Sequence, residues 1–188
     1  IVAKRSQLDV INSYIRQVRV PGELKVRMHK FFLARLQASD TSNVRREDIA
    51  LALPLTLQIE VATHTMLHII EGLPLFSGCS SGFTARLASL LRERTFDPGS
   101  ILYSKGEPCK EFMVLHVGAV EIYEQGDGSL DGPELVETLR PGDSLGTVPF
   151  LFGVHHMNNA SAAPDGEARV LLISLEDYHD ALKEHPDQ

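Results

Sequence analysis

Histidine, cysteine and carboxylate side chains are the groups in this sequence that could bind a metal or act in nucleophilic or acid–base chemistry. His64 and His68 stand four residues apart in a predicted helix, a spacing that can hold a metal ion, but no acidic or cysteine residue in register supplies a third ligand. Cys109 has no base near it in the sequence, so it is a poor candidate nucleophile. The sequence therefore presents no catalytic set, and we expect a protein that is not an enzyme and holds no metal.

Two further groups of residues look like chemical sites but are better explained as surface features. The glycine-rich stretch 126–133 joins two predicted strands rather than a strand and a helix, so it is interpreted as a hairpin loop and not as a phosphate cradle. Carboxylates alternate along the same two strands without the apolar enclosure that acid–base catalysis needs. We expect these carboxylates to face solvent: Glu121, Glu124, Glu134 and Glu137.

The stretch after Gly146 offers a more specific possibility, because backbone N–H groups can bind an anion where a helix begins. Pro149 removes one of those donors. Residues 141–168 contain no lysine or arginine that could add a positive charge. His155 and His156 could supply part of a charge at low pH, but a solvated loop is the favoured interpretation.

Length and composition indicate a globular chain of 188 residues, which can form one domain or two small ones around a sizeable core. Cys79 and Cys109 have neither metal-ligand spacing nor a disulfide pattern, as expected of thiols in a reducing cytosol. No apolar run approaches the roughly 20 residues that a membrane span requires, and no signal peptide is visible. The chain begins at Ile1 without a methionine, which suggests a fragment of a longer protein.

Charge is distributed unevenly along the chain. Residues 1–75 contain 10 Lys and Arg against 7 Asp and Glu, whereas residues 76–188 contain 8 against 18. The acidic second part argues against a nucleic-acid partner, because phosphate binding needs a basic face. The mildly basic first part is compatible with an anionic membrane surface or an acidic neighbour, and equally with an ordinary solvated helix surface.

The first part of the chain has the apolar periodicity of helices. Pro21-Gly22 separates the first two, and Gly72 ends the longest, in which Ile59, Ala62, Met66, Ile69 and Ile70 are expected to form the buried side. The first two helices have no obvious partner within so small a helical set, so their apolar stripes are candidates for docking on another subunit. The predicted helices cover residues 3–18, 21–36, 46–52, 55–71 and 83–91.

The second part of the chain has short apolar segments separated by glycine turns. Pro98-Gly99 has the residue types of a type II turn, and Gly106-Glu107-Pro108 forms a second turn. Strands are predicted at residues 101–103, 112–117 and 119–123, and a helix at 175–184. Short strands punctuated in this way predict an antiparallel roll or sandwich.

The order of residues from Phe96 to Gly118 resembles the opening of a cyclic-nucleotide-binding domain. That family begins its β-roll with an aromatic residue, a Pro-Gly turn, a strand, a Gly-Glu turn, an apolar strand and a glycine. The resemblance implies an α+β fold in which an antiparallel β-roll, similar to a double-stranded jelly roll, is flanked by helices.

The helices before the roll narrow the resemblance to ion channels. The segment 20–32 is similar to the helical C-linker of hyperpolarisation-activated, cyclic-nucleotide-gated and ether-à-go-go channels, and Leu73-Pro74-Leu75-Phe76 resembles their junction with the roll. Kinase regulatory subunits and bacterial transcription factors share the roll but lack this preface. The resemblance covers residues 3 to about 186 and implies a C-linker at 1–75 and a nucleotide-binding-type domain at 76–188, without the family's final capping helix.

The family's phosphate-binding cassette aligns with residues 144–161, after a Pro-Gly-Asp turn. A binding cassette presents Phe-Gly-Glu and then Arg-Thr-Ala, in which the glutamate contacts the ribose and the arginine the cyclic phosphate. When Gly146 and Ala160 are aligned with the family's motif, Thr147 takes the position of its glutamate, Asn158 that of its arginine and Asn159 that of its threonine. The site residues implied by the resemblance are Gly146, Thr147, Val148, Pro149, Asn158, Asn159 and Ala160.

Because both charged contacts are absent, we expect weak or no binding of cyclic AMP or cyclic GMP, and no other cofactor. The resemblance implies a cytosolic gating module of a tetrameric voltage-gated-type cation channel of the potassium class. It implies that four copies assemble through their C-linker helices and that each module acts on the transmembrane pore of its own chain. In ether-à-go-go-like channels a segment of the chain's own C-terminal region fills the pocket. The alternative is a sensor of a cyclic nucleotide or another small ligand, with altered pocket chemistry.

Overall fold

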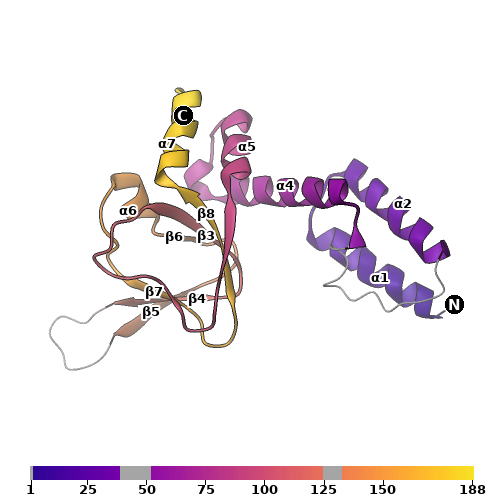
Figure 1. Cartoon of the computed structure of the whole chain (residues 1–188), viewed down its shortest axis with the longest axis horizontal. Coiled ribbons are helices and arrows are strands. Elements are labelled where there is room, and N and C mark those ends of the chain that lie inside the picture. The colour runs from indigo at the N-terminus through magenta and orange to yellow at the C-terminus, as the bar shows by residue number, and fades with distance from the viewer. Residues whose placement is uncertain (1, 39–51, 125–132) are drawn as a thin grey trace. The chain divides into compact units, whose positions relative to one another are not determined.

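The computed structural model of the protein describes residues 2–38, 52–124 and 133–188 (Figure 1). The chain divides into two compact units, Ile1–His68 and Ile69–Gln188. None of the helices in these described ranges has the length and apolarity needed to cross a lipid bilayer. The assignment of a C-linker to residues 1–75 stays a prediction.

The first unit contains α1 (Val2–Gln17), α2 (Gly22–Ala38) and most of α4 (Leu55–Gly72). Arg19 takes a positive φ of 50° in the turn between α1 and α2, where the chain reverses. Three of the predicted helices are thereby confirmed. The prediction of a helix at 46–52 falls almost wholly on residues outside those the structure describes.

The apolar stripes of α1 and α2 pack against each other and against the start of α4. A bidentate ion pair between Arg27 and Glu60, with N–O distances of 2.6 and 2.8 Å, links α2 to α4 at the surface. The expectation that these stripes lack a partner within the chain is therefore wrong, because α4 closes the cluster. Its buried members are Ile11, Ile15, Val20, Leu24, Met28, Phe32, Leu53, Leu57 and Val61.

The buried side of α4 differs from the prediction. Leu57 and Val61, one turn apart, face the cluster with α1 and α2, whereas the Ile59 side chain is 57% exposed and Ala62 is exposed. Of the predicted stripe only Ile70 is fully buried, and it belongs to the second unit. Apolar residues occur on several sides of α4, so periodicity did not identify the side that α1 and α2 cover.

The second unit is built on two four-stranded antiparallel sheets (Figure 1). The strand order is β1-β8-β3-β6 in one sheet and β2-β7-β4-β5 in the other. The predicted α+β fold with an antiparallel β-roll is thus confirmed. The strands are β1 (Arg92–Phe96), β2 (Ile101–Tyr103), β3 (Glu111–Val117), β4 (Val120–Glu124), β5 (Glu134–Leu139), β6 (Ser144–Leu145), β7 (Asn159–Ala162) and β8 (Ala168–Ser174).

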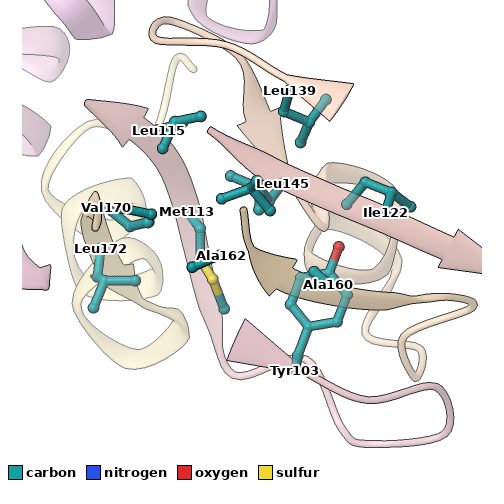
Figure 2. Close-up of a cluster of buried hydrophobic side chains, with 12 residues drawn as sticks. Tyr103, Met113, Leu115, Ile122, Leu139, Leu145, Ala160, Ala162, Val170 and Leu172 are labelled. Atoms are coloured by element: carbon teal, nitrogen blue, oxygen red, sulfur yellow. The ribbon is translucent and has the colours of Figure 1, made fainter. Parts of the chain in front are cut away.

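The interior of the roll is a closed apolar cluster supplied by both sheets (Figure 2). None of its twelve buried members exposes more than 7% of its surface. Alternate residues of β4 and β7 point inward, as the two-residue period of a strand requires. The members are Tyr103, Met113, Leu115, Val120, Ile122, Leu139, Leu145, Ala160, Ala162, Ala168, Val170 and Leu172.

Helices flank the roll and meet it through aromatic side chains. Two of the helices, α5 (Ser81–Leu90) and α7 (Leu175–Glu184), lie side by side (Figure 1). Ser80 and Ser174 cap them, each accepting a hydrogen bond from a backbone N–H at the start of its helix. The flank also contains the short helices η1 (Pro74–Phe76) and α6 (Thr147–Phe152). Edge or tilted ring contacts connect Phe76, Phe83, Phe112, Phe150 and Tyr178.

The turns that were predicted from local sequence are present. Gly99 has a φ of 72°, and the Ser100 N–H donates to the Asp97 carbonyl at 3.0 Å, as a type II turn with glycine in its third position requires. The β1 strand was not predicted. Its alternating charges, of the kind that protect a sheet edge, do not resemble a buried strand.

Candidate ligand-binding site

The short helix α6 is bounded by two glycines in the left-handed conformation. Gly146 at its start has φ 64° and Gly153 at its end has φ 63°. The Phe150 N–H donates to the Gly146 carbonyl at 2.9 Å, and the buried Phe150 ring contacts the rings of Phe112 and Tyr178. Glycine tolerates positive φ without steric cost, so the two ends of α6 are determined locally while Phe150 anchors it to the roll.

The loop after α6 is pinned to the turn that follows β2. His156 accepts a hydrogen bond from Gly106 N–H at 2.8 Å and donates its own N–H to the Glu107 carbonyl at 2.9 Å. Its imidazole stacks on the Tyr103 ring, with centroids 3.8 Å apart. His155 is exposed as expected, but His156 is only 4% exposed, so a solvated loop is wrong for His156.

The imidazole of His156 also lies against Gly146. A Cβ atom at Gly146 would be 3.0 Å from His156 Cε1 and 3.7 Å from Cys109 Sγ. His156 Nδ1 is buried and has no hydrogen-bond partner among the described residues. The start of α6, the β2 turn and the buried imidazole therefore form one packed group.

Burial governs the protonation of this group. It lowers the pKa of His156, which the nearby Glu107 carboxylate opposes, and it raises the pKa of Tyr103 to about 12. Burial also raises the pKa of the Cys109 thiol. Neutral forms of all three side chains are thereby favoured, and a neutral, buried thiol is unreactive, consistent with the expectation that Cys109 is not a nucleophile.

The predicted site residues on α6 keep their neutral hydrogen-bonding groups near the surface. The Thr147 and Ser144 hydroxyl oxygens are 2.9 Å apart and share a hydrogen bond. Val148 is 50% exposed, whereas Pro149 is buried. Asn158 is half-buried in the loop just before β7.

Asn159 and Ala160, the remaining predicted site residues, face opposite sides of β7. Ala160 belongs to the interior cluster. Asn159 is placed on the outer side of the sheet, where its Oδ1 accepts the Lys105 N–H at 2.8 Å. The structure therefore places Gly146 together with His156 and Cys109, and it separates Asn159 from them.

Lys105 is a residue that the sequence analysis missed. It is exposed, and its backbone adjoins Asn159 although 54 positions separate the two in the chain. Lys105 lies far from the cassette in the sequence, so the absence of lysine and arginine from residues 141–168 does not bear on it. The Gly-Glu turn after β2 could be recognised in the sequence. Residues 106 and 107 in this turn bond to His156, which brings the turn close to the cassette.

The other candidate sites remain unsupported by the geometry. In the described part of the chain, no three histidine, cysteine or acidic side chains lie close enough to hold a metal ion. Cys79 and Cys109 are both free thiols. The glycine-rich loop 126–133 lies, apart from Pro133, outside the described residues. Of the four surface carboxylates, Glu124, Glu134 and Glu137 are exposed and Glu121 is half-buried.

Known proteins resemble both the second unit and the chain as a whole. Residues 93–185 match the family model of the cyclic nucleotide-binding domain. A cyclic nucleotide-gated channel of Caenorhabditis elegans is 24% identical over 187 residues, covering 97% of this chain and 25% of the channel. Cyclic nucleotide-gated channel beta-3 of Canis lupus familiaris is 24% identical over 184 residues, which cover 97% of this chain and 23% of that channel. The chain thus spans about a quarter of the length of these relatives.

Solved structures confirm the fold. The regulatory domain of Toxoplasma gondii PKA, co-crystallised with cAMP, superposes with a TM-score of 0.58 at 16% identity, covering 72% of this chain and 50% of that one. The N-terminal domain of a Streptomyces coelicolor transcriptional regulator superposes with a TM-score of 0.56 at 21% identity, covering 63% of this chain and 80% of that one. Because the channel relatives align across the helices as well as the roll, the resemblance extends beyond the domain that these structures share.

The matched family model is that of a binding domain and the curated relatives are channels, which agrees with the prediction that the chain is not an enzyme. The solved structures share the fold of the roll, and the channel relatives align over 97% of the chain, which includes the helices before it. Residues 93–185 are therefore a cyclic nucleotide-binding domain, and together with the helical region before them they are related to cyclic nucleotide-gated channels.

Proposed function

We propose that the chain is the cytosolic gating module of a tetrameric cation channel, in which the roll is coupled mechanically to the pore and binds cyclic nucleotides weakly or not at all. The resemblance to channel subunits over 97% of the chain supports the channel assignment. The ligand proposal rests on the cassette itself, which has the neutral side chains Thr147 and Asn158 at the two positions where the family has charged ones. The stacking of His156 on Tyr103 holds its loop against the roll.

The energetic consequence of the missing arginine is large compared with a typical ligand affinity. A hydrogen bond to a charged group contributes about 1.5–3 kcal/mol, or roughly 10- to 150-fold in affinity. Asn158 offers only a neutral amide in that place, and Thr147 already shares a hydrogen bond with Ser144. Backbone N–H groups of α6 are left as the principal donors for a phosphate, and α6 is only six residues long.

The helical unit supports the coupling part of the proposal. Its three helices share a closed apolar core, so it can transmit force as one body. Val26 and Leu33 remain 51% and 43% exposed on α2, and they are candidates for the contact with a neighbouring subunit in a four-fold ring. On this proposal the chain lies on the cytosolic side of the membrane, next to the pore of the same polypeptide. Potassium selectivity and voltage gating stay predictions from the sequence resemblance.

A sensor of a neutral small ligand is the second candidate, favoured by the half-buried Asn158 and the paired hydroxyls of Ser144 and Thr147. Calorimetric titration of the chain with cyclic AMP and cyclic GMP, and then with the uncharged nucleosides, separates the candidates. We expect no saturable nucleotide binding tighter than about 10 μM, where the binding free energy is near −7 kcal/mol. Tighter nucleotide binding contradicts the first proposal, and saturable binding of a nucleoside alone supports the second.

A further inference from the structure

A hollow of about 430 Å³ lies on the outer face of the sheet formed by β2, β7, β4 and β5. Most of its lining surface is apolar, and Glu121 is its one charged side chain among the described residues. The lining residues used below are Ile101, Ser104, Glu121, Tyr123, Asn159 and Ser161.

The strand register separates this hollow from the interior of the roll. Glu121 pairs with Ser161 and Tyr123 pairs with Asn159, so these four side chains share one face of the sheet. Their neighbours Ile122 and Ala160 belong to the closed interior cluster on the other face. The hollow therefore opens on the outer face of the sheet; it shares residues 159–161 with the aligned cassette but is not lined by Gly146 or α6.

Glu121 presents a carboxylate to this hollow without a cationic partner. The Tyr123 hydroxyl donates to Glu121 Oε2 at 2.6 Å, and this hydrogen bond raises the pKa of the phenol. No ion pair to Glu121 occurs within the described residues. A carboxylate that only a neutral phenol satisfies, beside apolar surface, retains acceptor capacity for a cation.

We propose that this hollow binds the guanidinium group of an arginine on an extended peptide segment of a partner protein. The planar guanidinium fits a carboxylate bidentately and stacks on an aromatic ring, which an ammonium group does less well. Ile101, 67% exposed, offers an apolar surface for the methylene stem of the arginine. Asn159 Oδ1 already accepts the Lys105 N–H, so the amide NH₂ is the group left to donate to a peptide carbonyl.

The charge of the whole unit favours such a partner. Residues 69–188 contain 8 Lys and Arg against 19 Asp and Glu, so their field attracts basic segments. The same field, with Glu121 inside the hollow, disfavours nucleotides and other anions. Because Gly146 and α6 do not line the hollow, the proposal does not require the cassette to bind a nucleotide.

Two synthetic pentapeptides test the proposal on the chain itself. Both are acetylated and amidated; one has a central arginine between leucines, and the other has the uncharged isostere citrulline. Titrations followed by backbone amide NMR are expected to give saturable shifts at residues 101, 121, 123 and 161 with the arginine peptide. The citrulline peptide is expected to bind at least about tenfold more weakly, because the charged hydrogen bonds are lost.

Variants at two glutamates locate the charge that is responsible. Glu121→Gln is expected to weaken the arginine peptide at least about fivefold, the ratio that corresponds to a strong surface ion pair. Glu124→Gln, an equal change on the same strand but at an exposed side chain that does not line the hollow, is the matched control and is expected to leave binding unchanged. Tyr123→Phe keeps the ring and frees the carboxylate, so it retains binding.

Three results overturn the proposal: no saturable shifts with the arginine peptide, equal binding of the citrulline peptide to the unaltered chain, or equal losses in Glu121→Gln and Glu124→Gln. The citrulline comparison uses no variant, so it stands even if a substitution were to perturb folding.

Discussion

The imidazole of His156 stacks on the phenol ring of Tyr103, with ring planes 10° from parallel and centroids 3.8 Å apart. This contact joins the loop after α6 to the end of β2, and the backbone hydrogen bonds of His156 with Gly106 and Glu107 hold the same junction. The cassette loop is thus part of the packed roll.

Replacing His156 with alanine is therefore expected to lower the free energy of unfolding by about 2 kcal/mol or more, because the stack and a buried ring are both lost. Urea denaturation followed by circular dichroism measures the change. His155→Ala, next to it but exposed, is expected to shift the value by less than about 0.5 kcal/mol. Equal effects of the two variants would contradict the buried position of His156.

The stability of the chain is expected to fall in acid partly through His156. Burial lowers the pKa of His156, and Glu107, the carboxylate that faces it, opposes the shift. A histidine with a lower pKa when folded binds fewer protons in the folded state, so its contribution is complete above the unfolded pKa near 6.5 and is lost as the pH falls below it. Urea midpoints between about pH 7.5 and pH 5.5 are expected to fall less in His156→Phe than in the unaltered chain. Parallel pH profiles would exclude this role.

Gly146 and Gly153 have nearly equal positive φ angles but different surroundings, so substitutions at the two positions distinguish the cost of backbone strain from the cost of a steric contact. Gly153→Ala meets open space, so it is expected to cost about 1 kcal/mol for the left-handed backbone alone. Gly146→Ala has the same backbone cost and also brings a Cβ atom to 3.0 Å from His156, so we expect it to be more destabilising. The extra loss should disappear in a His156→Ala background, which a double-mutant cycle measures. An extra loss that persists there would place its cause elsewhere.

A single arginine is expected to restore part of the nucleotide affinity, if the missing charge is what weakened it. Asn158→Arg, at the position that aligns with the family's arginine, is expected to bind cyclic AMP about tenfold more tightly or better than the unaltered chain. Asn159→Arg adds the same charge on the outer face and is the matched control. Calorimetry compares the three proteins. Equal gains in both variants would indicate a nonspecific effect of charge.

The buried side of α4 can be checked at neighbouring positions. Val61→Ala removes two methyl groups from the closed helical cluster and is expected to cost about 2 kcal/mol of unfolding free energy. Ile59→Ala, at an exposed side chain, is expected to change it by less than about 0.5 kcal/mol. Thermal denaturation of both variants measures these changes in stability. A larger loss of stability in Ile59→Ala than in Val61→Ala would mean that the opposite side of α4 is buried.

The sequence alone predicted most of the fold because its signals were local. A Pro-Gly pair sets its turn through its own φ angles, whereas the short helix after Gly146 was implied by the family resemblance. The neutral residues at the aligned positions 147 and 158, and the absence of lysine and arginine from 141–168, could likewise be read directly from the sequence.

Only the tertiary structure decided which side each of several residues faces. His156 becomes buried because the loop returns onto β2, and Asn159 faces outward because β7 pairs with β4 in one particular register. The buried side of α4 depends on where α1 and α2 pack. Each of these outcomes joins segments distant in the sequence, and a shift of one residue in strand register would exchange the two faces. No local pattern contains that information.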